Sequence, residues 1–218
     1  MPSNVLPQLV MLSEPASSRA EAFRVLRARL EQASPQKLRS LLLTSPSAHE
    51  QRHLVAANLA LAFAEAGLSA VLVDADLHYP QLHSLFSLAE TPGLLQCLTE
   101  GNNSNVSLQE SPLSSLSLLV AGGSHPVPAQ LLSSRAMDSL MAALGDQERT
   151  VILVAPPVLP VADAILLAPK VDGVVLLSTA NRTTRSALRE AKSRLDGVRA
   201  NILGAVLDGV SSTFNGKY

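Results

Sequence analysis

Hydrophobic and polar positions divide the chain into short apolar runs separated by longer amphipathic stretches. Each run is nearly uniform in its apolar character instead of alternating with polar residues. Strands of this kind are covered on both faces, which is typical of a parallel sheet flanked by helices. The runs are SLLLTS at 40–45, SAVLVDAD at 69–76, TVILVAPP at 150–157, GVVLLSTA at 173–180 and NILGAVLDGV at 201–210. They predict a doubly wound α/β fold with a mainly parallel sheet.

The amphipathic stretches predict the helices that cover this sheet. Residues 17–33 carry apolar side chains at helical spacing, and Ser17 or Ser18 can cap this first helix. Further helices are expected over 54–67, 128–145 and 183–197. Residues 101–117 are rich in Ser and Asn and predict a flexible surface loop.

Composition supports one compact domain. Hydrophobic residues make up 47% of the chain and charged residues 16%, a balance that suits a single folded unit. We expect an N-terminal extension at 1–16, one α/β domain at 17–210 and a short tail at 211–218. The only cysteine, Cys97, cannot form an internal disulfide and is expected to be a small buried hydrophobe.

The charge balance and the apolar runs limit the partners of the chain. Seventeen basic and eighteen acidic residues leave a net charge of −1, so no overall field favours nucleic acid. The apolar runs are interrupted well before the roughly 20 residues of a membrane span, and the N-terminus lacks the pattern of a signal peptide. We therefore expect a cytoplasmic protein that reaches the inner face of a membrane only through a partner.

The loop after the first apolar run is the first place to look for a nucleotide site. Ligands of such sheets bind outside the carboxyl ends of the strands. The segment reads TSPSAHEQRHLVAANLA. A phosphate-binding loop needs glycines whose amides turn toward phosphate, a lysine for the terminal phosphates and a Ser or Thr for magnesium.

Several motifs, in order along about residues 17–210, point to one family. EAFRVLR, the TSPSAHEQRH loop, VLVDADLHYP, the long TVILVAPPVLPVADAILLAPKVDGVVLL segment and NRTTRSALREAKSRL resemble the bacterial tyrosine kinases that accompany polysaccharide export. These kinases are a branch of the MinD/ParA-like P-loop ATPases. The resemblance implies a P-loop fold with an N-terminal helix, and ATP-Mg as the family's cofactor.

The same resemblance shows that the chemical positions of the loop are changed, so its Walker motifs are degenerate. The glycine positions hold His49 and Gln51, the lysine position holds Arg52, and the magnesium position holds His53. Val154 stands where the family has a metal-side carboxylate. A side chain at a position that needs positive φ costs about 1–2 kcal/mol, a guanidinium is no substitute for a compact ammonium, and magnesium prefers oxygen to imidazole.

We therefore expect no functional catalytic residue and no bound cofactor, with ATP-Mg only if the deviant site is still competent. The vestigial loop comprises Ala48, His49, Glu50, Gln51, Arg52 and His53. The retained residues include Asp163. Asp208, at a position where relatives usually carry Asn, is a candidate for the base side of the site.

Asp74 and Asp76 are also retained. A buried carboxylate without its metal needs a new partner, so we expect these two to pair with Arg52 or to cap the following helix. An alternative is a zinc site, in which His49 and His53 join these carboxylates and His78. We favour solvated or repacked histidines and no metal.

The first helix carries a second candidate site. Glu21, Arg24 and Arg27 are three residues apart and share one stripe. Such a stripe can be a solvated face, but the resemblance implies a contact between subunits of a ring. This favours a homo-oligomer, an association with a kinase paralogue, or docking to a membrane chain-length regulator.

The leading hypothesis is a catalytically inactive relative of these kinases that regulates or scaffolds exopolysaccharide or capsule export. One alternative is an ATP-dependent tyrosine autokinase or ATPase with a deviant site. The other is a MinD/ParA-like positioning factor, which the kinase-branch motifs disfavour. The tail carries Tyr218 in place of the tyrosine cluster that these kinases phosphorylate.

Overall fold

The centre of the molecule is a seven-stranded sheet in the order β3-β4-β2-β5-β1-β6-β7. The computed structural model describes residues 8–33, 37–100, 106–145 and 148–210. The strands are β1 (Ser40–Thr44), β2 (Ala70–Asp74), β3 (Gln109–Glu110), β4 (Leu116–Leu119), β5 (Thr150–Val154), β6 (Gly173–Thr179) and β7 (Ile202–Asp208). All neighbouring strands are parallel except β3 and β4, so the predicted mainly parallel sheet is confirmed.

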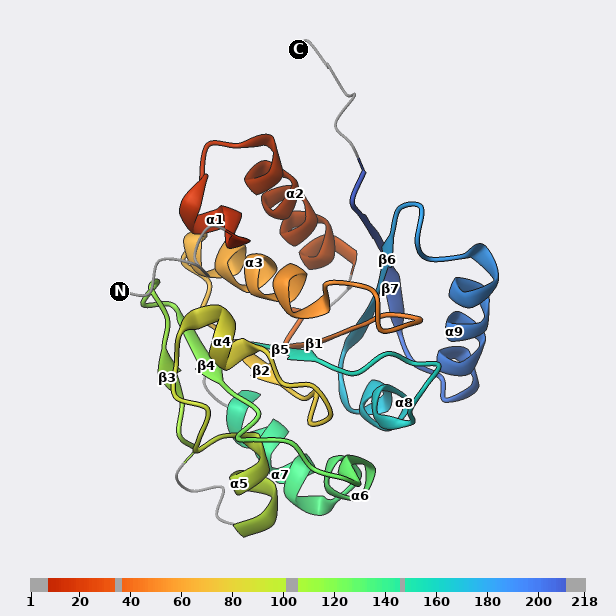
Figure 1. The fold of residues 1–218 in the computed structure, drawn as a ribbon. Helices are drawn as coiled ribbons and strands as arrows, with labels where there is room; N and C mark the ends of the chain where they lie inside the picture. Colours follow the sequence, from red (N-terminus) through yellow and green to blue (C-terminus); the bar gives the residue numbers. More distant parts are fainter. Residues whose placement is uncertain (1–7, 34–36, 101–105, 146–147, 211–218) are drawn as a thin grey trace.

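Helices cover both faces of this sheet (Figure 1). They are α1 (Val10–Ser13), α2 (Ser18–Ala33), α3 (Arg52–Glu65), α4 (Leu82–Phe86), α5 (Leu94–Glu100), α6 (Pro128–Leu132), α7 (Arg135–Gly145), α8 (Asp163–Leu167) and α9 (Arg185–Gly197), with a 3₁₀ turn at Ala168–Lys170. α3 lies against one face and carries α2 on its outer side, whereas α5 to α9 lie on the other side of the sheet.

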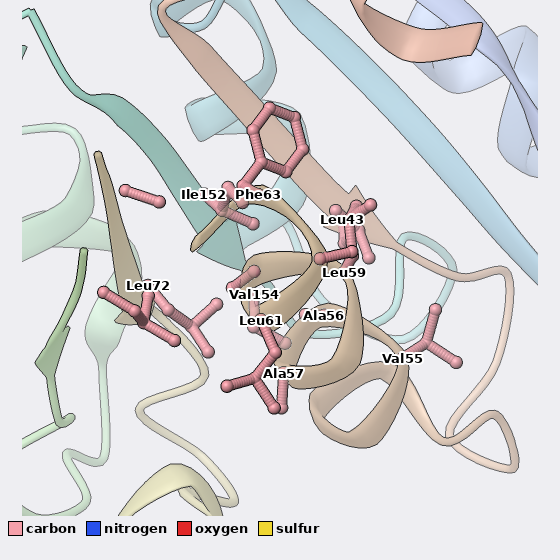
Figure 2. Packing of buried hydrophobic residues seen from close by; sticks show 14 of the residues in the cluster. Leu43, Val55, Ala56, Ala57, Leu59, Leu61, Phe63, Leu72, Ile152 and Val154 are labelled. Carbon is pink, nitrogen blue, oxygen red and sulfur yellow. The ribbon is translucent and has the colours of Figure 1, made fainter. Parts of the chain in front are cut away.

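Alternation along the central strands explains their uniform apolar character. Leu41 and Leu43 of β1 belong to the core on the α3 side, and Leu42 belongs to the core on the opposite side. β2, β5 and β6 divide their side chains in the same way. Figure 2 shows Leu59 and Phe63 of α3 among the strand side chains that they cover. Each central strand therefore needs apolar residues at every position.

β7 does not follow this rule. We expected it to be covered on both faces, but none of its residues is fully buried, and Gly204, Ala205 and Leu207 are exposed. The prediction was wrong because β7 is the last strand of the sheet. A strand at the edge has a partner on one side only, and composition does not reveal strand order.

The helix predicted over 128–145 is two helices, α6 and α7. The break lies at Ser133 and Ser134, whose hydroxyls donate to the carbonyls of Ala129 and Leu131 at 2.8 and 2.7 Å. Serine side chains that bond to nearby backbone compete with helix continuation. Ser17 or Ser18 was predicted to cap α2, and the structure has Ser17 as the cap, since its hydroxyl accepts the Ala20 amide at 3.1 Å.

Two other predicted regions are more structured than expected. Within the loop predicted over 101–117, β3 pairs with β4, while residues 101–105 lie outside the described part of the chain. In the predicted extension at 1–16, Leu9 is buried and Met11 donates its amide to Asn58 of α3 at 3.1 Å. Cys97 is buried as predicted, and burial raises the pKa of its thiol.

Candidate functional site

The candidate site lies at the carboxyl ends of β1, β2 and β5, where the fold class places its ligands. The loop over 45–51 leaves β1 and leads into α3. Thr44 anchors the start of this loop, since its hydroxyl donates to the carbonyl of Pro156 beyond β5 at 2.7 Å. The first turn of α3 then presents Arg52 and His53 toward the end of β2, and both side chains are buried.

Arg52 forms a buried ion pair with Asp76. The guanidinium Nη2 lies 3.0 Å from Asp76 Oδ2, and both side chains are at most 5% exposed. Nη1 also donates to the Ser45 hydroxyl at 3.1 Å and to the Ser47 carbonyl at 3.2 Å. The side chain at the lysine position therefore points to the chain's own carboxylate and loop. This confirms the predicted pairing of Arg52 with an acidic residue after β2.

His53 occupies the magnesium position and contacts the other retained carboxylate. Its Nε2 lies 3.0 Å from Asp74 Oδ1, and both groups are buried. The second carboxylate oxygen of Asp74 accepts the amides of Gln81 and Leu82 at 2.9 and 3.0 Å, at the start of α4. Asp74 thus caps the following helix, as predicted. Both carboxylates that the resemblance assigns to the nucleotide site are committed to protein groups.

The loop itself has taken a path that suits ordinary side chains. Among the described residues, positive φ occurs at neither His49 nor Gln51, so the loop does not take the positive-φ conformation in which these side chains would cost free energy. Ala48 and His49 are exposed, whereas Glu50 is buried. The Glu50 carboxylate accepts the Ser47 hydroxyl at 3.0 Å and the Thr183 hydroxyl at 2.7 Å, which ties the loop to the segment before α9.

Val154 is a core residue. It is fully buried at the end of β5, in register with Asp74 of β2 on one side and Leu43 of β1 on the other. It packs in the cluster on the α3 side of the sheet (Figure 2). A carboxylate at this position would add a third negative charge beside Asp74 and Asp76, whereas valine adds apolar packing.

Comparison with known proteins identifies the family. No protein-family model matches the chain. Tyrosine-protein kinase YwqD of Bacillus subtilis is 33% identical over 217 residues, which are 99% of this chain and 92% of YwqD. The chain belongs to the bacterial tyrosine kinase family. The putative tyrosine-protein kinase CapB of Staphylococcus aureus is 27% identical over 99% of this chain and 95% of CapB.

Solved structures agree with this assignment. The kinase domain of the Escherichia coli tyrosine kinase Etk superimposes with a TM-score of 0.89 at 27% identity, covering 96% of this chain and 83% of that domain. The cell division ATPase MinD of Pyrococcus furiosus has a TM-score of 0.66 at 19% identity, over 80% of this chain and 74% of MinD. The MinD likeness concerns the fold alone and shows that this chain has the fold of that ATPase.

The residues at the loop of this tyrosine kinase relative do not fit ATP-Mg. The polar ends of Arg52 and His53 are turned to Asp76 and Asp74, so the groups that would face phosphate and magnesium already have buried partners. Magnesium also requires oxygen ligands, and His53 offers nitrogen. Arg52 Nε is buried without a hydrogen-bond partner among the described residues, so the internal pairing does not satisfy every donor.

The geometry does not support a zinc site. His49 is exposed on the loop while His53 is buried, so the two do not share a face. The Nε2 atom of His78 lies 3.0 Å from Asp163 Oδ2, so His78 contacts Asp163 and not the other two histidines. Within the described ranges, no group of three or more His, Cys, Asp or Glu side chains is placed to hold a metal ion.

The His78–Asp163 pair was not predicted. Asp163 begins α8 and is 2% exposed, and His78 lies on the loop after β2. Burial raises the pKa of Asp163, and the nearby Asp76 carboxylate adds to this effect, whereas His78 opposes it. The signal in the sequence was that both residues follow strands whose carboxyl ends meet at one edge of the sheet.

The charged stripe of α2 has acidic partners within the chain. Arg24 Nε and Nη2 each donate to the Glu65 carboxylate of α3 at 2.7 Å, and Nη1 lies 3.2 Å from Glu21. Arg27 pairs with Glu31 one turn along α2. The hydrogen bond to Glu65 raises the pKa of Arg24, and the same bond lowers the pKa of Glu65. The contact of this stripe with another subunit stays a prediction.

Asp208 lies away from the paired carboxylates. It ends β7, is half-buried, and lines a groove between β7 and α2. Its backbone carbonyl accepts the Ala180 amide at 2.8 Å. Its assignment to the base side of a nucleotide site stays a prediction.

No helix in the described part of this kinase relative is both long and apolar enough to cross a membrane.

Proposed function

We propose that this chain is a catalytically inactive member of the bacterial tyrosine kinase family that regulates or scaffolds exopolysaccharide or capsule biosynthesis and export. The observation that carries this proposal is the pair of buried contacts Arg52–Asp76 and His53–Asp74 at the loop. The chain supplies its own cationic and hydrogen-bonding groups to the carboxylates that the family uses around ATP-Mg.

The energetics of buried ion pairs support the loss of nucleotide binding. Separating one partner from a buried pair costs about 3–5 kcal/mol. A nucleotide that had to open the Arg52–Asp76 pair would lose that free energy from its binding. Since every 1.4 kcal/mol is a factor of ten in affinity, the loss is roughly two to three and a half orders of magnitude.

Protein contacts then account for the function. We propose a homo-oligomer or an association with an intact kinase paralogue, recruited to the inner membrane face by a chain-length regulator. Glu21, Arg24 and Arg27 on α2 are the proposed contact residues. Arg24 and Arg27 are about one-quarter exposed even with their internal partners, so their outer edges are available to a neighbour.

The second candidate function is an ATP-dependent tyrosine kinase, which the names of the relatives favour. Incubation with γ-labelled ATP and magnesium separates the two. We expect Tyr79, which is 74% exposed, and Tyr218, which lies outside the described residues, to remain unlabelled. YwqD is the reference under the same conditions. Stoichiometric self-labelling of this chain would establish the kinase function and refute the proposal.

A further inference from the structure

A groove of about 770 Å³ runs between α2, α3 and the edge strand β7. Its volume is within the range of about 300–1,000 Å³ that is common for ligand pockets. Phe23 and Leu26 of α2 and Leu54 and Val55 of α3 line the apolar part. The groove lies apart from the buried ion pairs at the loop, and none of Asp74, Asp76 or His53 lines it.

The groove borders the free edge of β7 rather than one of its faces. A strand face contributes every second residue, because successive side chains point in opposite directions. Here the consecutive residues Ala205, Val206, Leu207 and Asp208 all line the groove. β7 pairs with β6 on one side and is the last strand in the sheet order. Its outer backbone groups therefore face the groove, where another strand could pair with them.

Exposed apolar side chains gather at this groove. Five large hydrophobic residues stand out as exposed in the described chain, and three of them, Val25, Leu207 and Val210, line it. Leu207 is 59% exposed and Val25 is 43% exposed. Apolar surface gathered along an unprotected strand edge is typical of a binding site.

The charges at the groove indicate the chemistry of the occupant. Arg19 and Arg29 line it, are exposed, and have no ion-pair partner among the described residues. The acidic side chains in the lining are Glu21 and Asp208. Glu21 lies 3.2 Å from Arg24, which also pairs with Glu65. Because Arg19 and Arg29 have no such partner, acidic side chains of an occupant would complement them on the α2 side of the groove.

We propose that an extended segment of a partner protein binds here as an additional strand beside β7. Arg19 and Arg29 are ten residues apart on α2, which is about 15 Å along a helix. Residues four apart in a strand share a face and lie about 13 Å apart. The segment therefore carries a bulky apolar residue between two carboxylates spaced four residues apart. This inference goes beyond the proposed function, and it holds whether or not nucleotide binds.

A fluorescein-labelled peptide, TETFTET, is the probe. It places two glutamates and one phenylalanine on the same strand face, and TKTFTKT is the matched peptide of opposite charge. Fluorescence anisotropy with the full chain is expected to show saturable binding of TETFTET and at least tenfold weaker binding of TKTFTKT. The Arg19→Glu, Arg29→Glu variant is expected to bind TETFTET at least tenfold more weakly. Arg135→Glu, Arg189→Glu, which reverses two exposed arginines elsewhere, is the control and should bind normally.

Hydrogen exchange with and without the peptide tests the strand geometry. Added protection is expected in β7 and in α2, and Leu207→Lys should remove it while Val127→Lys, at another exposed apolar position, should not. No saturable binding up to about 1 mM, equal binding of both peptides, or protection confined to elements other than β7 and α2 would overturn the proposal. A wild-type dimer that Leu207→Lys converts to a monomer would also overturn it, because the groove would then belong to a second copy of the chain.

Discussion

The carboxyl ends of the central strands and the β7 edge differ in how their charges and apolar surfaces are satisfied. At the central strands, Arg52, His53, Asp74 and Asp76 are all buried and contact one another. At the edge, Arg19 and Arg29 lack acidic partners in the described chain, and Leu207 is exposed. The first region is closed by its own side chains, and the second is open.

The comparison of these two regions indicates where this chain, which keeps the fold of its family, has side chains free to contact another molecule. The sheet and its helices superimpose closely on a kinase domain, and at the loop Arg52 and His53 contact Asp76 and Asp74 of the same chain. A buried charge with an internal partner must give up that partner to bind a ligand, whereas an exposed apolar edge gains free energy when it is covered. We therefore expect this protein to bind its partners at the β7 edge and α2 instead of at the loop after β1.

The prediction with the largest expected effect concerns the buried Arg52–Asp76 pair at the loop. Asp76→Asn keeps an oxygen that can accept the amides of His78 and Tyr79 but removes the charge that Arg52 needs. We expect a loss of about 3–5 kcal/mol in the free energy of unfolding, measured by urea denaturation, because a buried guanidinium is left unpaired.

The matched control is Asp196→Asn, which removes the acid of the exposed Lys192–Asp196 pair. Exposed pairs contribute about 0–1 kcal/mol. If Asp76→Asn cost no more than Asp196→Asn, the pair at the loop would not be a closed structural unit, and the contrast between the two regions would fail.

A second prediction concerns the α2 stripe. Arg24→Glu, Arg27→Glu should lower the association constant of the homo-oligomer, or of the complex with a partner, at least tenfold in light scattering over a concentration series. The reason is that a neighbour's acidic groups would meet like charge. Assembly should not depend on ATP.

The internal Arg24–Glu65 pair requires its own control, because reversal of Arg24 alone also breaks the contact between α2 and α3. Combining Arg24→Glu with Glu65→Arg restores that contact with opposite polarity. If the combined variant assembles as the wild type does, Arg24 acts only within the subunit, and the stripe is not an interface.

The smallest expected effect is a pH dependence at Asp163. Because burial raises its pKa in the folded state, the folded protein favours the protonated carboxyl. This contribution to stability is present below the ordinary pKa of an Asp and is lost as the pH rises through the raised value. Asp163→Asn should lack that decline, so the stability difference between wild type and variant should shift in favour of the variant with rising pH.

Urea denaturation at a series of pH values from about 3.5 to 8 measures this difference. His78→Gln is the companion variant, since His78 favours the ionised form of Asp163. Without it the loss of stability with rising pH should be larger and should extend to higher pH. Parallel pH profiles for the wild type and Asp163→Asn would contradict the prediction.

The sequence predicted the central strands well, because one physical requirement acts on them locally. β1, β2, β5 and β6 lie between two helical layers, so every position must be apolar, and this is visible in the composition of each run. β7 has similar composition but lies at the edge. Strand order depends on contacts that are distant in the sequence, so the exposure of β7 was not predictable from its own residues.

In the candidate site, too, contacts that follow from a local requirement were predictable, and contacts between distant segments were not. Asp74 and Asp76 were expected to pair with Arg52 or to cap the following helix, because a buried carboxylate without a metal requires a new partner. The contact of Arg24 with Glu65, 41 positions away, depends on how α2 crosses α3, and no local pattern carries that information. The break between α6 and α7 was missed because apolar spacing continues across Ser133 and Ser134, whose backbone contacts end the first helix.

The central claim is that the closed loop no longer binds nucleotide, and one titration tests it most directly. Thermal unfolding is followed at increasing ATP, with and without magnesium, with YwqD as the reference. A ligand at 100 times its dissociation constant stabilises a fold by about 2.7 kcal/mol. We predict no magnesium-dependent shift for this chain at micromolar nucleotide. A saturable, magnesium-dependent rise in the unfolding temperature in that range would contradict the account.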